Sequence, residues 1–534
     1  MPPLVRIQTV IAVSASAFAV ALLAASCGGG GSDDPAPIAT TAACASNTCS
    51  GSGAVTHPST PEVLCPASLD YDTVYTGGSG SGEYIKVKFD TSRKQYQMTF
   101  IESEVPTSAG QVNATRAGLT ITGDFENPNL YTVTNGQGVA STPLKLPTTE
   151  QNRCAFVLEN GQTLDGSYHV AIDPNDPPML FVGNGIVGGG IPGSTVQFDG
   201  LTLAPGTQVA VVPTHRFDYY PFLAFSKTVT DFSKVAGHYN ELGIHFTPSG
   251  GNFQTTAAIP TGTALGWQPD GVQVTETLNA DGSCMPDSGQ TYTSCPTTGA
   301  NWTLRTNTDG SKDNVFTSAA NIAGLGTVYP AVGAGLLQSS LGGNQAHGIM
   351  IAGDLDGQVI PVVIRVGYAR SGTGLSDSSV DDQLGISLLA PVRNVDQSSL
   401  SGAFIGANSV TACGIVSAYG PTSTSPPIYE GACLDDTTTK NAGVNYTSTI
   451  FQGANAAFLN PFTSTAATNF ALDFTQTQPG LVKVTAQNDF TSGAATVFKT
   501  GDTGYLIKVG SVYAMLMNGT GLPNPFFTIG AFVQ

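Results

Sequence analysis

The chain has 534 residues, of which 11% are charged, and glycine (64) and proline (33) are frequent. Its formal net charge of −18 argues against nucleic-acid binding, because that function needs clustered lysine and arginine. Many turn-forming residues and few charges are typical of an extracytoplasmic all-β protein, and the length allows several domains.

The first 26 residues have the layout of an export signal. Arg6 supplies a positive charge, and residues 7–23 contain no charged side chain and end in small residues. A transmembrane anchor is one alternative, although the apolar segment is at the lower length limit for spanning a bilayer. A plain secretory signal, cut near Ser26, is the other alternative.

The stretch Leu22-Leu23-Ala24-Ala25-Ser26-Cys27 resembles the lipobox of a bacterial lipoprotein, with Ala24 where leucine is usual. The resemblance implies that Cys27 becomes the first mature residue and carries lipid. The protein is then expected to bind the membrane through this lipid. Several acyl chains anchor a protein stably, whereas one chain binds only marginally. Gly28 follows the cysteine in place of aspartate, which by the same resemblance favours the outer membrane of the cell envelope.

Residues 27–62 are predicted to form a flexible tether, because their Gly, Ser, Pro and Thr content cannot bury a core. With Cys27 reserved for lipid, the other eight cysteines predict disulfides in an oxidising compartment. Their connectivity stays open. Spacing suggests three near pairs and two remaining cysteines: Cys44 with Cys49, Cys284 with Cys295, Cys413 with Cys433, and Cys65 and Cys154 left over. A metal site is the alternative, but no CxxC or zinc-like histidine spacing occurs, so we expect no metal and no cofactor.

Alternating apolar and polar residues predict β-strands from residue 83 onward, and no long helical periodicity competes with them. We therefore expect an all-β fold of tandem antiparallel barrels or sandwiches. The predicted strands include Glu83–Phe89, Gln95–Phe100, Tyr168–Ile172, Met179–Val182, Gln208–Val212, Val272–Leu278, Trp302–Arg305, Val359–Val366, Leu481–Ala486 and Tyr505–Val509.

One internal repeat is detectable, because Asp231–Tyr239 aligns with Asp396–Phe404 through the pattern D-x-S-x-[VL]-[AS]-G-x-[YF]. The glycine allows a bend or close packing, and the aromatic residue can plug one end of a core. Up-and-down barrels of the lipocalin kind begin in a similar way. The domain-sized offset predicts three β domains, over residues 63–225, 226–386 and 387–534.

Several motifs suggest chemistry but fit turns better. Gly183–Gly188 reads G-x-G-x-x-G, yet no helix can follow it, so a loop between strands is preferred to a dinucleotide site. Asp354–Gly357 lacks the final glutamate of an EF-hand calcium loop and fits a hairpin turn. No serine stands in G-x-S-x-G, and His238 and His245 are expected to be solvated or hydrogen-bonded, on opposite faces of one strand.

The whole chain is similar to uncharacterised lipoproteins of Gram-negative bacteria with a domain of unknown function. Its residues identify no ligand or activity. The leading hypothesis is a non-enzymatic binding module, and the alternatives are a structural or adhesion spacer and an extracytoplasmic hydrolase. A binding barrel predicts an apolar interior cavity, a spacer predicts filled interiors, and a hydrolase predicts convergent histidine and carboxylate groups.

Overall fold

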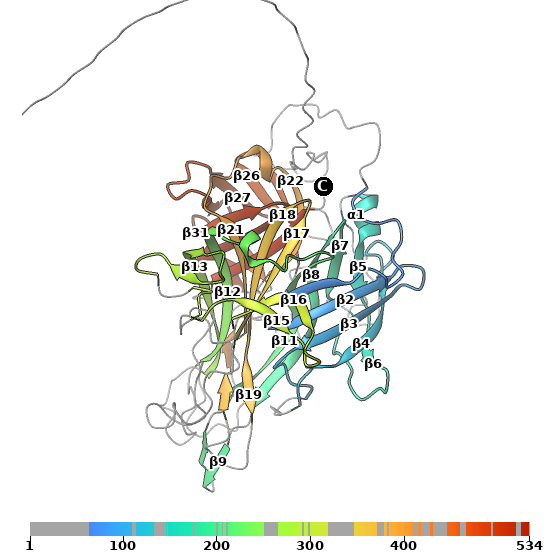
Figure 1. Cartoon of the computed structure of the whole chain (residues 1–534). Coiled ribbons are helices and arrows are strands. Elements are labelled where there is room, and N and C mark those ends of the chain that lie inside the picture. Colours follow the sequence, from blue (N-terminus) through green and yellow to red (C-terminus); the bar gives the residue numbers. More distant parts are fainter. Residues whose placement is uncertain are drawn as a thin grey trace, which may run out of the picture. The chain divides into compact units, whose positions relative to one another are not determined.

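The computed structural model describes the chain from residue 63 to residue 532 with internal gaps (Figure 1). Contacts divide the chain into residues 1–33 and 34–534, and all described residues lie in the second unit. No helix in the described part combines the length and apolarity needed to cross a membrane. The described ranges are 63–108, 114–132, 146, 148–172, 174, 177–198, 201–204, 207–209, 212–249, 265–290, 293–296, 300–318, 347–370, 379–381, 384–408, 414–417, 428–430, 446–459, 466–492, 495–518 and 525–532.

Antiparallel strands from residues 75–225 form a closed hydrogen-bonded ring, here called the first barrel. Each ring strand pairs with the next along the chain, and the pairing of the first with the last closes the ring. The ring strands are β1 (Tyr75–Ser79), β2 (Tyr84–Asp90), β3 (Gln95–Glu102), β4 (Thr120–Glu126), β5 (Ala155–Leu158), β7 (Met179–Val182), β8 (Ile186–Phe198) and β11 (Val212–Phe225). Short strands β6 (Gln162–Thr163), β9 (Leu201–Ala204) and β10 (Thr207–Val209) accompany it.

Aromatic rings fill part of the interior of the first barrel. Phe89 on β2 contacts Phe156 on β5 with 5.3 Å between ring centroids, although these strands are not hydrogen-bonded neighbours. Phe125 on β4 stacks on Phe156 at 4.0 Å, and Tyr75 packs edge-on against Phe89. Contacts across the ring therefore hold opposite walls together, and each aromatic pair adds to the free energy of burial.

A buried ion pair lies at one end of the first barrel. Arg116 donates through Nη2 and Nε to the two carboxylate oxygens of Glu83, at 2.6 and 2.9 Å, and both side chains are fully buried. Ser81 and Ser103 donate to the same carboxylate, and Arg116 also donates to the Pro192 carbonyl at 3.1 Å. Such a pair is tolerated in a core because these hydrogen bonds satisfy its polar atoms.

The next strands form an open antiparallel sheet, here called the second sheet, with the order β15-β16-β17-β18-β21-β12-β13-β23-β24 and β14 beside β13. Its strands are β12 (Gly237–Ser249), β13 (Leu265–Leu278), β14 (Cys284–Pro286), β15 (Thr303–Thr306), β16 (Lys312–Thr317), β17 (His347–Leu355), β18 (Gln358–Val366), β21 (Leu384–Pro391), β23 (Gly414–Ser417) and β24 (Ile428–Glu430). A small separate hairpin joins β19 (Tyr368–Arg370) to β20 (Ser379–Asp381). The division of the chain into three domains stays a prediction, and β21 crosses its expected boundary at residue 386.

The C-terminal strands form a closed up-and-down barrel, here called the C-terminal barrel. Its strands are β22 (Gly402–Asn408), β25 (Tyr446–Gln452), β26 (Asn455–Leu459), β27 (Ala466–Asp473), β28 (Val482–Ala486), β31 (Thr503–Val509), β32 (Val512–Asn518) and β33 (Pro525–Phe532). The short strands β29 (Phe490–Ser492) and β30 (Ala495–Phe498) pair with each other. The prediction of an all-β fold with antiparallel barrels is confirmed, and the described residues contain one short α-helix, α1 (Thr149–Cys154).

The interior of the C-terminal barrel is also occupied by aromatic rings. Phe404, Phe451 and Tyr513 contact one another edge to face, with centroids 5.1 to 5.3 Å apart. A second group joins rings from β26, β27, β29, β30 and β33 at centroid distances of 4.7 to 6.1 Å: Phe458, Phe470, Phe490, Phe498 and Phe526. These rings pack against one another within one buried cluster, as side chains that fill an eight-stranded barrel do.

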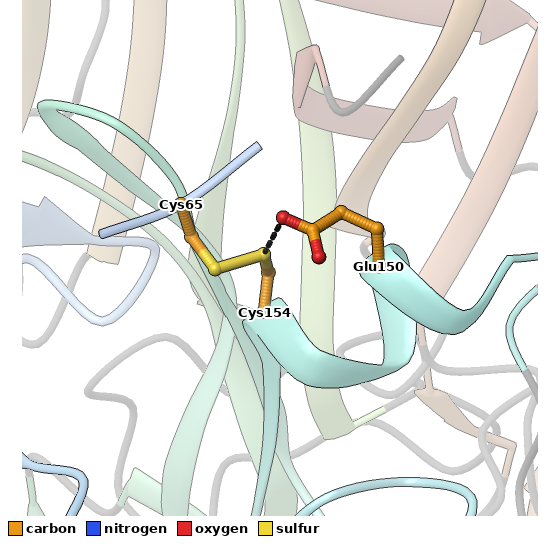
Figure 2. A group of neighbouring side chains, drawn as sticks. All are labelled: Cys65, Glu150 and Cys154. Atoms are coloured by element: carbon orange, nitrogen blue, oxygen red, sulfur yellow. Dashed lines mark hydrogen bonds between the residues drawn. A yellow bond between two sulfur atoms is a disulfide. The ribbon is translucent and has the colours of Figure 1, made fainter. Parts of the chain in front are cut away.

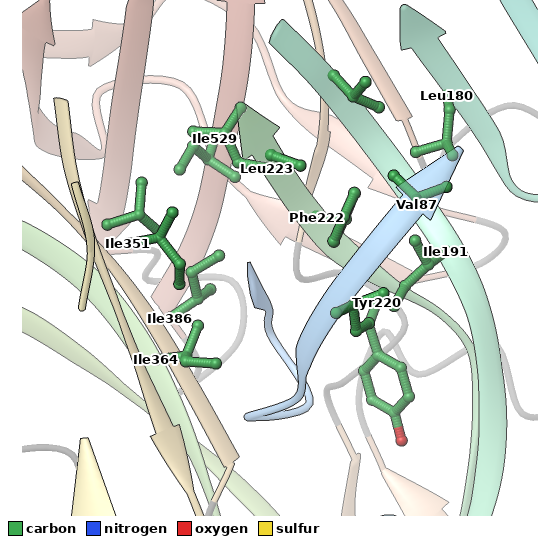
Figure 3. Packing of buried hydrophobic residues seen from close by; sticks show 14 of the residues in the cluster. Val87, Leu180, Ile191, Tyr220, Phe222, Leu223, Ile351, Ile364, Ile386 and Ile529 are labelled. Atoms are coloured by element: carbon green, nitrogen blue, oxygen red, sulfur yellow. The ribbon is translucent and has the colours of Figure 1, made fainter. Parts of the chain in front are cut away.

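A single hydrophobic cluster contains residues of the first barrel, the second sheet and the C-terminal barrel. Figure 3 shows Leu223 of β11 and Ile529 of β33 close together, with Ile351 and Ile364 of the second sheet nearby. The approach is close enough to require glycine at Gly78, where an added Cβ would lie 2.6 Å from the Ile364 side chain. The three sheets therefore share one core cluster, while the aromatic interior of the C-terminal barrel forms a cluster of its own.

The internal repeat encodes the same local structure twice. Asp231 and Asp396 each accept a hydrogen bond from a backbone N–H two residues later, at 3.0 and 2.9 Å. A 3-10 turn follows in both copies, η1 (Phe232–Lys234) and η4 (Ser398–Leu400), and then β12 or β22 begins. Asp231 is the N-cap of η1, whereas Asp396 stands one residue before the N-cap Gln397 of η4. In both copies the glycine starts the strand, so the repeat marks the entry to a strand in both sheets.

The predicted strand at Tyr168–Ile172 is wrong. Only an isolated bridge between His169 and Gln162 forms there. The chain reverses at Asp165–Gly166, where Gly166 has φ +68°, and this turn leaves only the two residues of β6 to pair with β4. Residues 168–172 do alternate apolar and polar side chains, but β6, the strand next to them, is too short to pair with a full strand.

Candidate functional site

The structure describes four of the nine cysteines, and they form two disulfides, Cys65–Cys154 and Cys284–Cys295. The second pair is the one that close spacing suggested, and the first joins the two cysteines left over. The remaining predicted positions lie outside the described residues: Cys27, the expected lipid site, and Cys44, Cys49, Cys413 and Cys433. The two disulfides are notable because a glutamate lies beside each of them.

The Cys65–Cys154 disulfide is placed by helix α1. Thr148 caps the helix, and its hydroxyl accepts the Gln151 N–H in a capping box. The last residue of α1 is Cys154, and Glu150, one turn earlier, faces the disulfide with Oε1 3.8 Å from the Cys154 sulfur (Figure 2). The short helix thus carries both the cysteine and the acidic side chain on one face.

Glu150 is held in its charged form. Arg153 donates to both carboxylate oxygens, at 2.6 and 2.8 Å, and the Leu64 N–H donates to Oε1 at 3.1 Å. The Arg153 hydrogen bond lowers the pKa of Glu150 below its ordinary value and outweighs the opposing effect of partial burial. Arg153 also donates to the Cys65 carbonyl at 3.1 Å, so this group ties residues 64–65 to the first barrel.

The Cys284–Cys295 disulfide closes a short loop beside β13. Cys284 begins β14, and Cys295 follows Ser294, whose N–H and hydroxyl both face buried carboxylates. The Cys295 sulfur lies 3.4 Å from Oε2 of Glu276. The part of this loop nearest the disulfide therefore packs on acidic side chains, whereas its Met285 is exposed to solvent.

Glu241 and Glu276 form a buried acidic pair. The register pairs Glu241 with Val274 and Tyr239 with Glu276, so the two glutamates are diagonal neighbours on one face of β12 and β13. The Ser294 N–H donates to Oε2 of both residues at 3.1 Å, and both side chains have 0% exposure. No cation pairs with either carboxylate in the described ranges.

The electrostatics of this pair follow from its burial. Burial raises the pKa of Glu276 to about 7, because the Ser294 and Thr293 hydrogen bonds that favour the charged form are weaker. Burial and then the neighbouring Glu276 carboxylate raise the pKa of Glu241 well above its ordinary value. Glu241 Oε1 and Ser387 Oγ lack a hydrogen-bond partner of good geometry among the described residues. The pair therefore favours retaining protons.

Each disulfide and its glutamate could supply three ligand atoms to a metal ion, since these atoms lie within 4.8 Å of one another. Metal binding needs thiolates, and the sulfur atoms of a disulfide are not available in that form. In the disulfide form, each group therefore offers only its carboxylate. The chemistry left to these groups is hydrogen bonding and proton binding.

A charged cluster also connects the first barrel with the second sheet. Arg305 donates to both Glu102 and Asp313, Lys86 donates to Asp313 at 2.8 Å, and His347 Nε2 lies 2.7 Å from Glu102. Burial alone would raise the pKa of Glu102, but the hydrogen bond and charge of His347 and the charge of Arg305 lower it. Glu102 and Asp313 thus each contact two basic side chains. These contacts stabilise the packing of the first barrel against the second sheet.

The motifs noted in the sequence lie in turns. Gly183-Asn184-Gly185 is the tight connection between β7 and β8, with the Gly183 N–H bonded to the Ile186 carbonyl at 2.8 Å. Asp356-Gly357 is the two-residue turn between β17 and β18, where both residues have positive φ, as a type I′ hairpin requires. His238 is exposed and lies 3.2 Å from Asp287, whereas His245 is buried on the other face of β12.

Sequence reasoning missed the acidic pair and the charged cluster. Their members are far apart in the chain, and Glu102 and His347 are separated by 245 residues. One local signal pointed to the acidic pair: a glutamate at a position of an alternating strand where an apolar, core-facing residue is expected. Glu276 occupies such a position in the predicted strand Val272–Leu278, between Val274 and Leu278.

Comparison with known proteins gives a family but no activity. No curated protein matches the chain. Two structures of mutants of the vaccine antigen transferrin binding protein B from Haemophilus parasuis match with TM-scores of 0.24 and 0.22 and identities of 9% and 10%. The matches cover 84% and 85% of this chain but 65% and 66% of those chains, just under two thirds of their length, and they support no inference on function. The family model described as "Protein of unknown function (DUF2957)" matches residues 95–531, so the chain belongs to that family.

Proposed function

We propose that the chain is a lipid-anchored protein of the cell envelope, held at the outer membrane through Cys27, that acts by binding and not by catalysis. The supporting observation is the packing of the two closed barrels, whose interiors are occupied by contacting aromatic rings. A filled barrel is a rigid support for its loops and outer faces. The proposed partner is therefore a macromolecule of the envelope or its surroundings that contacts the outside of the protein.

The shared core favours a binder over a spacer built from separate domains. One hydrophobic cluster contains Phe222 of the first barrel, Ile386 of the second sheet and Ile529 of the C-terminal barrel. Independent spacer domains would each bury their own core and meet through small interfaces. A continuous core instead fixes surfaces from all three sheets relative to one another, which suits recognition of one extended partner.

The paired carboxylates favour a non-enzymatic role. A general acid or base needs a free proton-transfer group, whereas Glu102 contacts both Arg305 and His347. The Glu241–Glu276 pair resembles a catalytic carboxylate pair in composition, but both side chains have 0% exposure. A buried pair of this kind is suited to proton binding within the fold.

The anchor is tested with Cys27→Ala in the native host, with Cys44→Ala as the matched cysteine control. We expect Cys27→Ala to move the protein from the membrane fraction to the soluble fraction and to remove the acyl mass from the N-terminal peptide. Cys44→Ala should remain lipidated and membrane-bound. Membrane retention of Cys27→Ala, or an unmodified Cys27 in the wild type, would rule out the anchor.

The binding function is tested with purified protein against envelope polysaccharides, lipopolysaccharide, peptidoglycan, secreted glycoproteins and a panel of small apolar ligands. We expect one macromolecular class to raise the melting temperature with increasing concentration, as ligand linkage requires. Stoichiometric binding of a small apolar ligand with a change in barrel fluorescence would contradict the filled-barrel argument. Turnover of any panel member would contradict the non-enzymatic assignment.

A further inference from the structure

The Glu241–Glu276 pair and the loop closed by Cys284–Cys295 form one unit that the proposed binding function leaves unexplained. Two carboxylates share the Ser294 N–H, and Glu276 also accepts from the Ser294 hydroxyl and Thr293. Both carboxylates lie on the same buried face of β12 and β13. These neutral donors cannot neutralise two negative charges in a low-dielectric interior. Some other group must therefore compensate the negative charge of the Glu241 and Glu276 carboxylates.

We propose that the unit is a proton-operated clamp, in which the pair holds at least one proton and thereby fixes Ser294 and the disulfide-closed loop to the second sheet. When the pair loses its protons as the pH rises, two adjacent negative charges are left in a buried site. The Ser294 hydrogen bonds favour the charged form, but burial of both carboxylates and the repulsion between them outweigh these bonds. The loop is therefore released from β13 so that water can reach the carboxylates.

The geometry of the loop explains how a change at the carboxylates reaches the surface. Ser294 directly precedes Cys295, and Cys295 is covalently bonded to Cys284 at the start of β14. The sulfur of Cys295 itself lies 3.4 Å from Glu276. Between the two cysteines the chain exposes Met285, and Asp287 is half-buried. A displacement of Ser294 therefore pulls on a short closed loop with an exposed apolar residue.

The neighbouring charged groups do not supply a counterion. Asp287, on the same loop, raises the pKa of Glu276 further and is itself 3.2 Å from His238. His245 on β12 and Arg365 on β18 share the face of Glu241 by register, since both pair with Gly385. Both make interactions of their own, and neither bonds to the acidic pair. A proton is the positive charge that remains available to the pair.

The direction of the pH effect follows from linkage. Glu276 has its pKa raised from 4.5 to about 7, so the folded state binds more protons than the unfolded state between these values. The stabilising contribution of the protonated pair is fully present below pH 4.5 and is lost as the pH rises through about 7. The clamp is therefore closed in acidic solution and opens toward alkaline pH.

The test is hydrogen exchange of the full chain with its disulfides intact, followed from pH 5.5 to 8.5 and corrected for intrinsic exchange rates. We expect the Ser294 amide and loop 284–296 to lose about tenfold protection across a midpoint near pH 7. The double variant Glu241→Gln/Glu276→Gln keeps the side-chain shape without the charge, so its loop should stay protected at every pH. Glu150→Gln at the other disulfide is the matched control, and it should keep the wild-type pH profile of loop 284–296.

Three outcomes would overturn the clamp: pH-independent protection of the wild-type loop, a wild-type pH profile in the double variant, or calcium or zinc ions restoring protection at pH 8.5. The third would assign the pair to a cation and not to a proton. If the double variant does not fold, carboxyl-¹³C NMR of glutamate-labelled wild type decides the question. Two glutamate signals that titrate far above the others are expected, and their absence would refute the proposal.

Discussion

Each of the two disulfides in the described part of the chain has a glutamate beside it, but the pKa values of the two glutamates are shifted in opposite directions. Cys65–Cys154 and Cys284–Cys295 each contact one glutamate. Glu150 has Arg153 bound to both its oxygens and stays ionised, whereas Glu276 has no cation, is fully buried and has a pKa raised to about 7. The role of a carboxylate beside a disulfide is thus decided by burial and by the supply of a cation.

The largest expected difference between the two disulfides concerns stability. Cys65–Cys154 closes 89 residues and Cys284–Cys295 closes 11, so the first removes more entropy from the unfolded chain. The loop-entropy relation gives about 4 to 5 kcal/mol for Cys65→Ser/Cys154→Ser and about 3 kcal/mol for Cys284→Ser/Cys295→Ser. Urea unfolding of both double variants measures the two losses. Equal losses would show that loop length does not govern these disulfides.

A third carboxylate sharpens the comparison, because Glu83 is as buried as Glu276 but has its cation, Arg116. Glu83→Gln would leave the Arg116 charge buried without a counterion, so we expect a loss of about 3 to 5 kcal/mol in unfolding free energy. Lys94→Met, which removes a partly exposed pair with Glu126, is the matched control and should cost at most about 1 kcal/mol. A loss at Glu83 no larger than the control would mean that the serine hydrogen bonds, and not the ion pair, hold this site.

Local patterns in the sequence predicted much of the fold. Strands such as β2 and β3 alternate apolar and polar residues within a few positions, and the aspartate of each D-x-S repeat accepts the N–H of its own serine. These features depend on neighbours in the chain, so they can be read from it. The closure of the barrels and the addition of β23 and β24 to the second sheet depend on pairings between distant segments. No local pattern encodes those pairings.

The candidate site was harder to predict for the same reason. Glu241 and Glu276 are two acidic residues among 38, and only the register of β12 against β13 brings them together. The Cys65–Cys154 bond spans 89 residues, and spacing alone left these two cysteines unassigned. A glutamate at a buried strand position was the one readable hint, because an unpaired carboxylate is rarely placed there without a role.

The pH dependence of stability should have opposite signs at the two glutamates beside the disulfides. For Glu276, whose pKa rises from 4.5 to about 7 on folding, the shift corresponds to roughly 3 kcal/mol. Wild type loses this stability between pH 4.5 and 8, whereas Glu276→Gln does not. The unfolding free energy of Glu276→Gln minus that of wild type should therefore increase by roughly 3 kcal/mol between pH 4.5 and pH 8. Urea titrations at both pH values provide the measurement, and a constant difference would contradict the raised pKa.

The smallest expected effect is at Glu150, and its sign is the opposite one. The pKa of Glu150 is lowered on folding, so its contribution is present above the unfolded value of 4.5 and is lost as the pH falls through the folded value. Glu150→Gln should cost about 0.2 to 1 kcal/mol at pH 7, since the pair with Arg153 is partly exposed, and close to nothing in strong acid. Paired urea titrations at pH 7 and in acid measure it, with Glu276→Gln run alongside. If both variants changed with pH in the same direction, the contrast between the two disulfide groups would rest on burial alone, and the role given to Arg153 would be wrong.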